Sequence, residues 1–229
     1  MNRLVAALIT VGVSFVPGCA HHVKGNGVAA SQENYSVDAS TSATATLTAP
    51  RGGIADVDNR YRDLARDIAD ARNSLVEFWR SKGIDLSDIT IFFANTPEES
   101  TCLLDGQEQT MACTRYADNG IMVDLSLMYK GYSTLIEPYS EGFVFSVVGH
   151  EFGHYINKMK THLPDGTNSE GFASCVSGVA ATGVGIAQEA LIGIKDTIGI
   201  GSYEGHYGAF KHGTGTDLRG CYDDLPNKG

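Results

Sequence analysis

The chain has 229 residues, with 17 basic and 27 acidic side chains and a formal net charge of −10. A hydrophobic fraction of 42% and a charged fraction of 19% are typical of a globular protein, so these values exclude a disordered or collagen-like chain. The acidic balance and the lack of a basic stripe argue against nucleic acid as a partner.

The N-terminal residues have the layout of a signal peptide. Arg3 precedes an apolar run over residues 4–16, which is too short to span a bilayer as a mature helix. The junction at Gly18 and Cys19 resembles the site where a bacterial lipoprotein signal is cut before a cysteine that is then acylated. We therefore expect a signal peptide over residues 1–18, a lipid on Cys19 and an extracytoplasmic protein anchored to a membrane of the cell envelope. Cleavage as an ordinary secretory signal is the alternative.

Residues 19–53 are expected to be a flexible linker. Ala, Ser, Thr and Gly dominate this segment, so it cannot bury enough apolar surface to offset the entropy of ordering it. Residues 54–229 then form one domain of the usual size.

Secondary structure in this domain is predicted from hydrophobic periodicity. Apolar residues recur at three- and four-residue steps over residues 56–81, which predicts a long amphipathic helix. A β-branched and aromatic run at 89–94 predicts a buried strand, and the alternation over 121–126 predicts a second one. Further helices are expected over residues 142–160, 169–181, 186–198 and 214–224. Helices at both ends with few strands between them predict an α+β fold.

Five cysteines are present, and four remain if Cys19 carries a lipid. Four cysteines allow three pairings. We favour Cys102–Cys113, which closes a short loop, and Cys175–Cys221, which ties the C-terminal segment to the core. Both disulfides would suit an oxidising compartment.

The segment from His150 to His154 carries the clearest chemical signal. On a helix, a spacing of four residues places His150 and His154 on one face, one turn apart, so that both can bind one ion. Glu151 between them can act on water, as in the HExxH arrangement of zinc peptidases. The preceding residues are apolar, so the helix is buried, and polar groups without partners would be costly there. A bound Zn²⁺ supplies that partner.

A catalytic zinc generally has three protein ligands. The metzincin spacing would put the third at residue 160, which is a lysine, so that class is excluded. His162 lies near a helix-breaking proline, and Asp165 reads as a turn residue. Glu170 opens an apolar segment that should pack antiparallel to the first helix, and it is therefore the preferred third ligand.

These segments resemble a gluzincin-like family of bacterial neutral zinc metallopeptidases. The resemblance rests on residues 148–154 and on residues 170–178, where the family typically has Glu-Leu-Gln-Ala-Asp-Cys-x-Ala-Gly. Three further matches follow the same order along the chain and extend the resemblance over residues 57–224: the cysteine pair 102 and 113, residues 123–125, and residues 212–214 with Arg219. The resemblance implies a mainly helical, zincin-like metallopeptidase domain with a small β-sheet. It also implies Glu170 as the third ligand.

The chain departs from the family after the third ligand, where Ser174 replaces an aspartate. That aspartate would orient a histidine ligand from the second shell. We expect Ser174 to take its place as a hydrogen-bond acceptor, with Asp124 as the acid that supplies the missing charge.

The expected activity is hydrolysis of peptide bonds in a peptide or protein substrate, with Zn²⁺ activating water and Glu151 as the general base. His212 is the first choice for a donor that stabilises the oxyanion, ahead of His206 and Tyr207. The strand around Val123 is expected to pair with an extended substrate. Two alternatives stay open: a non-catalytic metal-binding lipoprotein, and a zinc hydrolase of a non-peptide amide such as a cell-wall component.

Overall fold

The structure of the protein is a computed structural model. The described residues are 53–104, 108–160, 167–197 and 204–223. The expected signal peptide, Cys19 and nearly all of the expected linker lie outside them, as do His162 and Asp165. Across the described ranges, no helix is both long enough and apolar enough to cross a membrane.

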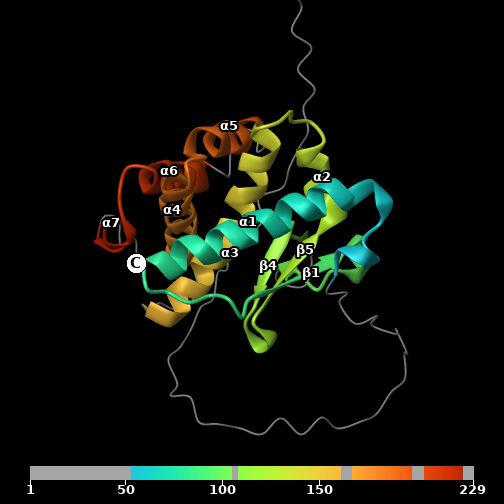
Figure 1. The fold of residues 1–229 in the computed structure, drawn as a ribbon, viewed down its shortest axis with the longest axis horizontal. Helices are drawn as coiled ribbons and strands as arrows, with labels where there is room; N and C mark the ends of the chain where they lie inside the picture. Colours follow the sequence, from blue (N-terminus) through green and yellow to red (C-terminus); the bar gives the residue numbers. More distant parts are fainter. Residues whose placement is uncertain (1–52, 105–107, 161–166, 198–203, 224–229) are drawn as a thin grey trace, which may run out of the picture.

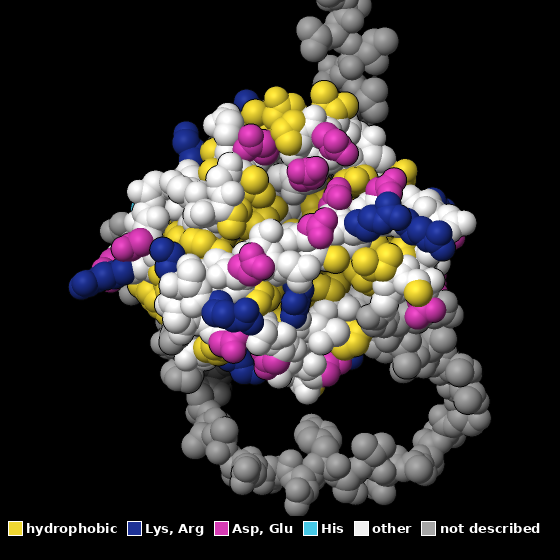
Figure 2. All heavy atoms as spheres, viewed as in Figure 1, with side chains coloured by type: hydrophobic (Ala, Val, Ile, Leu, Met, Phe, Trp, Pro, Cys, Tyr) yellow, Lys and Arg dark blue, Asp and Glu magenta, His cyan; other side chains and the backbone are white. Residues whose placement is uncertain are grey.

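The first long helix, α1 (Arg62–Ser81), begins later than the periodicity predicts. Two 3-10 turns, Ile54–Asp56 and Asn59–Tyr61, precede it. Val57 and Tyr61 are buried, which explains why the apolar pattern extends through this segment although its backbone is not α-helical. On the outer side of α1, charged side chains of both signs cover the surface (Figure 2), and Asp63 and Arg66 form an exposed ion pair there.

The domain also contains a three-stranded sheet. Its strands are β1 (Thr90–Ala94), β5 (Gly120–Asp124) and β4 (Ala112–Arg115), in the order β1-β5-β4. β5 pairs parallel to β1 and antiparallel to β4, so β5 is central and β4 lies at an edge. The short strands β2 (Leu103–Leu104) and β3 (Glu108–Gln109) form a separate two-stranded sheet.

The second predicted strand ends earlier than expected, because a helix begins at its last residues. The helix α2 (Leu125–Tyr132) follows β5 directly. Asp124 caps it, since its Oδ1 accepts hydrogen bonds from the backbone N–H of Leu127 at 3.0 Å and from Ser126 Oγ at 2.7 Å. The alternation of apolar residues across Leu125 hid this cap from the sequence analysis.

Five helices complete the domain: α3 (Tyr139–Lys160), α4 (Thr167–Val184), α5 (Ala187–Thr197), α6 (Glu204–Gly213) and α7 (Leu218–Asp223). All but α6 correspond to predicted helices. α3 lies at the centre of the domain, with the sheet on one side and α4 to α7 on the other, and α1 crosses in front of both (Figure 1). The fold is therefore α+β, mainly helical with a small sheet, as predicted.

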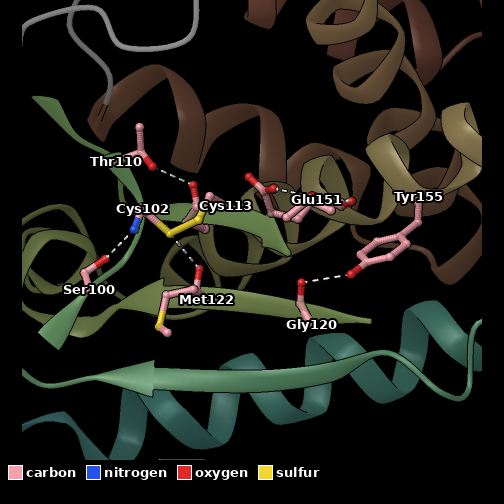
Figure 3. The surroundings of a disulfide bond; sticks show 10 residues. Ser100, Cys102, Thr110, Cys113, Gly120, Met122, Glu151 and Tyr155 are labelled. Carbon is pink, nitrogen blue, oxygen red and sulfur yellow. Dashed lines mark hydrogen bonds between the residues drawn. A yellow bond between two sulfur atoms is a disulfide. The ribbon is translucent and has the colours of Figure 1, made fainter. Parts of the chain in front are cut away.

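Both expected disulfides are present. Cys102–Cys113 joins the segment before β2 to β4, and Figure 3 shows it beside Met122 of β5. Cys175–Cys221 joins α4 to α7, so it ties the C-terminal helix to the core as the sequence analysis expected. Two disulfides in one small domain indicate an oxidising, extracytoplasmic environment.

Candidate metal centre

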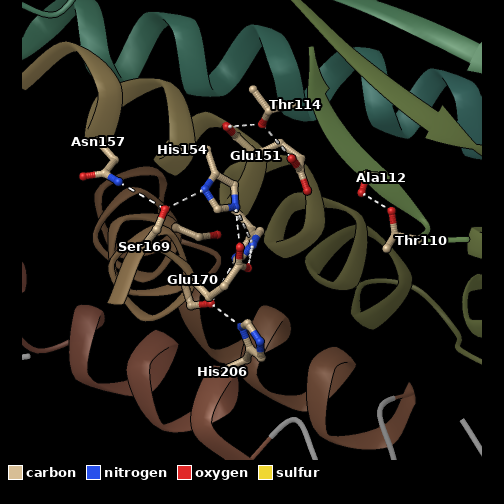
Figure 4. Close-up of polar contacts among 12 residues, drawn as sticks. Thr110, Ala112, Thr114, Glu151, His154, Asn157, Ser169, Glu170 and His206 are labelled. Atoms are coloured by element: carbon tan, nitrogen blue, oxygen red, sulfur yellow. Dashed lines mark hydrogen bonds and ion pairs between the residues drawn. The ribbon is translucent and has the colours of Figure 1, made fainter. Parts of the chain in front are cut away.

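Three side chains converge where α3 and α4 pack together (Figure 4). His150 and His154 lie one turn apart on α3, and Glu170 reaches them from the first turn of α4. Glu170 Oε2 lies 3.0 Å from His150 Nε2, and Glu170 Oε1 lies 3.4 Å from His154 Nε2. The two Nε2 atoms are 3.1 Å apart. The possible ligand atoms of this group, one from each residue, all lie within 4.8 Å of one another.

Small residues allow the two helices to approach closely enough for this convergence. The helices run antiparallel, with Gly153 of α3 against Ala173 of α4 and Gly149 one turn away against Ser177. A Cβ atom on Gly153 would lie 2.5 Å from Ala173 Cα and 2.6 Å from its carbonyl oxygen. Glycine is therefore required at this contact, and the contact holds Glu170 opposite the histidines.

The chemistry of these three donors fits a metal ion. Two imidazole nitrogens and a carboxylate form one of the ligand sets that proteins use for zinc, and three protein ligands leave a fourth position for water or substrate. All three side chains are mostly buried. Burial alone would raise the pKa of Glu170, but hydrogen bonds from His150 and His154, together with their charge, hold that pKa well below its usual range. Glu170 is therefore a carboxylate, the form that binds a metal.

Two serines hold the other ring nitrogens of the histidines. Ser174 Oγ lies 3.0 Å from His150 Nδ1, so Ser174 contacts a histidine of the group, as expected. Ser169 Oγ lies 3.2 Å from His154 Nδ1 and accepts a hydrogen bond from Asn157 Nδ2 at 3.1 Å. Such contacts fix the orientation of ligand histidines. Ser169 carries no sequence motif and was not predicted.

Glu151 is buried on the same helix and points to the sheet. Its Oε2 accepts a hydrogen bond of 2.7 Å from Thr114 Oγ1 on strand β4. One turn further along α3, Tyr155 donates to the backbone oxygens of Arg115 and Gly120, at 3.0 and 2.9 Å. These bonds join α3 to β4 and fix the Glu151 carboxylate beside that strand. Thr114 was also missed, because β4 has only four residues and gave no strand signal.

Asp124 does not take the role expected of it. It is fully buried, but its Oδ1 caps α2, and its hydrogen bonds go to that helix rather than to either histidine. The hydrogen bonds of Asp124 therefore give it no contact with either histidine.

His206, and not His212, is the α6 histidine that reaches the metal-binding group. His206 Nδ1 lies 2.9 Å from Ser174 Oγ, and its ring packs edge-on against His150 with 5.5 Å between centroids. His212 is six residues further along, which places it about 9 Å away along the helix axis and on a different face. Burial, reinforced by the positive charge of His150, lowers the pKa of His206 to about 4, although Glu170 opposes this. His206 is therefore neutral at pH 7.

The strand around Val123 is not available to a substrate, because β5 is hydrogen-bonded on both sides. β4, which carries Thr114, lies at an edge of the sheet.

Comparison with protein-family models, with curated proteins and with solved structures finds no match to the chain. A functional assignment therefore rests on the residues of the chain itself.

Proposed function

We propose that this protein is a zincin-like peptidase that uses Zn²⁺ to hydrolyse peptide bonds outside the cytoplasm. The observation that carries the proposal is the convergence of His150, His154 and Glu170 next to a buried carboxylate, Glu151, on the same helix. A metal site alone needs the two histidines and Glu170, but it has no use for Glu151.

The chain's own residues supply binding and proton transfer. His150, His154 and Glu170 would hold the zinc, which lowers the pKa of a bound water to about 7 and polarises a carbonyl group. Glu151 would take a proton from the attacking water and later deliver it to the leaving amine. Its hydrogen bond to Thr114 fixes one carboxylate oxygen and leaves the other oxygen for this transfer.

The position of β4 favours a peptide over a compact amide. An edge strand has backbone groups on which an extended peptide can form hydrogen bonds. Since Thr114 of β4 contacts Glu151, a peptide added to this edge would pass close to the general base. This edge replaces the strand around Val123 as the proposed binding element.

The location of the protein is part of the proposal. The disulfides indicate an oxidising compartment. The lipid expected on Cys19 would hold the domain at the membrane, through an expected linker of 35 residues, 19–53.

A comparison of Glu151→Gln with His154→Ala tests the proposal. We expect Glu151→Gln to retain zinc in a metal analysis, because the ligands are intact, and to lose hydrolysis of a broad peptide library by about 10²–10⁴-fold. His154→Ala should lose both zinc and hydrolysis. Hydrolysis that survives Glu151→Gln would contradict the mechanism. Zinc binding by a wild-type protein that cleaves no peptide would instead favour the non-catalytic alternative or a non-peptide substrate.

A further inference from the structure

The central helix α3 is open to solvent along one narrow stripe. Every residue from 142 to 157, a range that the structure describes in full, is buried except Val147, His150 and His154. These three residues are spaced by three and four positions, so they lie on one face of the helix. We call them the open stripe of α3. Since both histidines belong to the metal-binding group, a substrate bound at the metal contacts α3 along this stripe.

Lys158 continues the open stripe toward the C-terminal end of α3. It follows His154 by four residues and Glu151 by seven, so at about 100° per residue it lies within about 40° of both around the helix axis. Its side chain is exposed. Its Cα lies about 10 Å beyond that of Glu151 along the axis. Lys158 therefore stands on the face of α3 that carries a metal-binding histidine and the proposed general base.

Tyr116 holds the Lys158 ammonium at this end of the stripe. Lys158 Nζ lies 3.9 Å from the centre of the Tyr116 ring, which is a cation–π contact. The Tyr116 hydroxyl donates to the His154 carbonyl oxygen at 3.4 Å, and its ring packs edge-on against Tyr155 with 5.4 Å between centroids. The ring is therefore fixed against α3. Because Tyr116 directly follows β4, it keeps the ammonium close to the end of that strand.

No described acid balances the charge of Lys158. None of the ion pairs among the described residues includes it, although the whole chain has 27 acidic and 17 basic side chains. A tyrosine ring attracts the ammonium through its π-electrons but carries no full negative charge. An ammonium has three N–H donors, so Lys158 retains the capacity to bind a carboxylate from outside the chain.

We propose that Lys158 binds a carboxylate of the substrate, about three residues from the bond that is cleaved. The inference rests on the proposed peptidase function, because the metal defines where that bond lies. An extended peptide advances about 3.3–3.4 Å per residue, so the distance of about 10 Å between Glu151 and Lys158 along the helix corresponds to about three residues. Val147, at the opposite end of the open stripe, is apolar, so α3 attracts a negative charge at one end of the stripe only.

Binding of matched peptides to the zinc-loaded protein tests the inference. Three sets of short peptides are compared: acetylated and amidated peptides with one Glu, the same peptides with Gln in its place, and Gln peptides with a free C-terminal carboxylate. Affinity is measured with Glu151→Gln, so that the peptides stay intact, and hydrolysis is measured with the wild type. We expect the Glu set to bind about 2–5-fold more tightly than the amidated Gln set, as for a solvent-exposed ion pair, and the preference to shrink at high salt. A preference for the third set would identify the bound carboxylate as the end of the peptide.

Substitutions at Lys158 separate its charge from its packing. Lys158→Met should abolish the preference for a carboxylate, Lys158→Glu should reverse it in favour of peptides with Lys, and Lys158→Arg should keep it. Lys82→Glu is the matched control, because Lys82 also lies over an aromatic ring, with Nζ 5.5 Å from the centre of the Phe78 ring. It has the same net charge as Lys158→Glu and should bind the peptides as the unsubstituted protein does.

Hydrolysis by the wild type distinguishes this inference from the proposed function. If peptides are cleaved and the Glu and Gln sets bind equally, the role of Lys158 is overturned and the peptidase stands. A preference that survives in Lys158→Met, or that is lost equally in Lys82→Glu, would also overturn it. A preference that depends on Lys158 in a protein that cleaves nothing would support the carboxylate site and count against the peptidase. A zinc-loaded protein that binds no peptide would contradict both.

Discussion

At the scale of single residues, Glu170 is the ligand whose replacement is most informative. The structure places one Glu170 carboxylate oxygen 3.0 Å from His150 Nε2 and the other 3.4 Å from His154 Nε2, so Glu170→Ala would remove a proposed ligand and not merely a neighbour. We expect its zinc affinity to fall by more than the roughly 10–100-fold typical of losing a second-shell partner. Asp165→Ala and His162→Ala, the alternatives weighed from the sequence, should retain zinc. Equilibrium zinc titration of the three variants checks this, and tight binding by Glu170→Ala would refute the ligand set.

The three members of the metal-binding group could be predicted from the sequence, but most of their surroundings could not. His150 and His154 follow from helix periodicity, and Glu170 follows from a charge at the start of an apolar segment. Thr114 and Ser169 are ordinary residue types without a pattern, and their roles depend on which elements pack together. His206 was predicted only as an alternative to His212. His212 and His206 illustrate the difficulty, since both lie on α6 and only the packing of α6 on α4 decides which one reaches the site.

The buried imidazole of His206 gives the metal-free protein a dependence on pH. Its pKa is about 4 in the folded state, and that of an unperturbed histidine is about 6.5. Between these values the unfolded chain binds the proton and the folded chain does not. The free energy of unfolding should therefore fall as pH drops from about 6.5 to about 4, by at most about 3 kcal/mol from this residue. His206→Gln should show a shallower fall in denaturant unfolding, and identical slopes would contradict the burial argument.

At the scale of elements, the predicted helices are those with a continuous apolar face. α1 and α3 to α5 show the required periodicity, whereas α6 contains Gly205, Gly208 and Gly213 and has low intrinsic helix propensity. Contacts with α4 hold α6 in place, because Gly178 lies directly against the carbonyl of Phe210. β4 is too short to be recognised without its partner β5. Tertiary contacts, which a single sequence does not display, determine both elements.

The close contact between α3 and α4 predicts a specific cost for an added methyl group. Gly153→Ala would force the helices apart at Ala173, since the new Cβ would lie 2.5 Å from Ala173 Cα. We expect a loss of about 1–3 kcal/mol in the free energy of unfolding, and weaker zinc binding because Glu170 moves with α4. Gly208→Ala on α6 is the matched control, since nothing lies within 4 Å of its added Cβ, and it should be stabilising by about 0.5–1 kcal/mol. A Gly153→Ala protein with unaltered stability and zinc affinity would show that the helices need not touch to form the site.

At the scale of the whole molecule, the two disulfides constrain the unfolded chain to different extents. Cys102–Cys113 closes a loop with a sequence separation of 11, and Cys175–Cys221 one with a separation of 46. In the chain-entropy description, removing these bonds costs about 3 and about 4 kcal/mol respectively. The difference should grow further because Cys175 and Cys221 are both fully buried, so serines there would leave buried hydroxyls.

We therefore expect the variant with serine at both positions 175 and 221 to be the less stable of the two disulfide-free variants, by roughly 1 kcal/mol or more. The variant with serine at positions 102 and 113 is the matched control, and denaturant unfolding of both under oxidising conditions gives the comparison. The loss should extend to the metal site, because Cys175 is adjacent to Ser174 and its bond to α7 helps to hold α4 in place. If the order of stabilities were reversed, the stabilisation by Cys175–Cys221 would not come from the entropy of the unfolded chain. If zinc affinity were equal in both variants, α4 would be held by α3 and α6 alone.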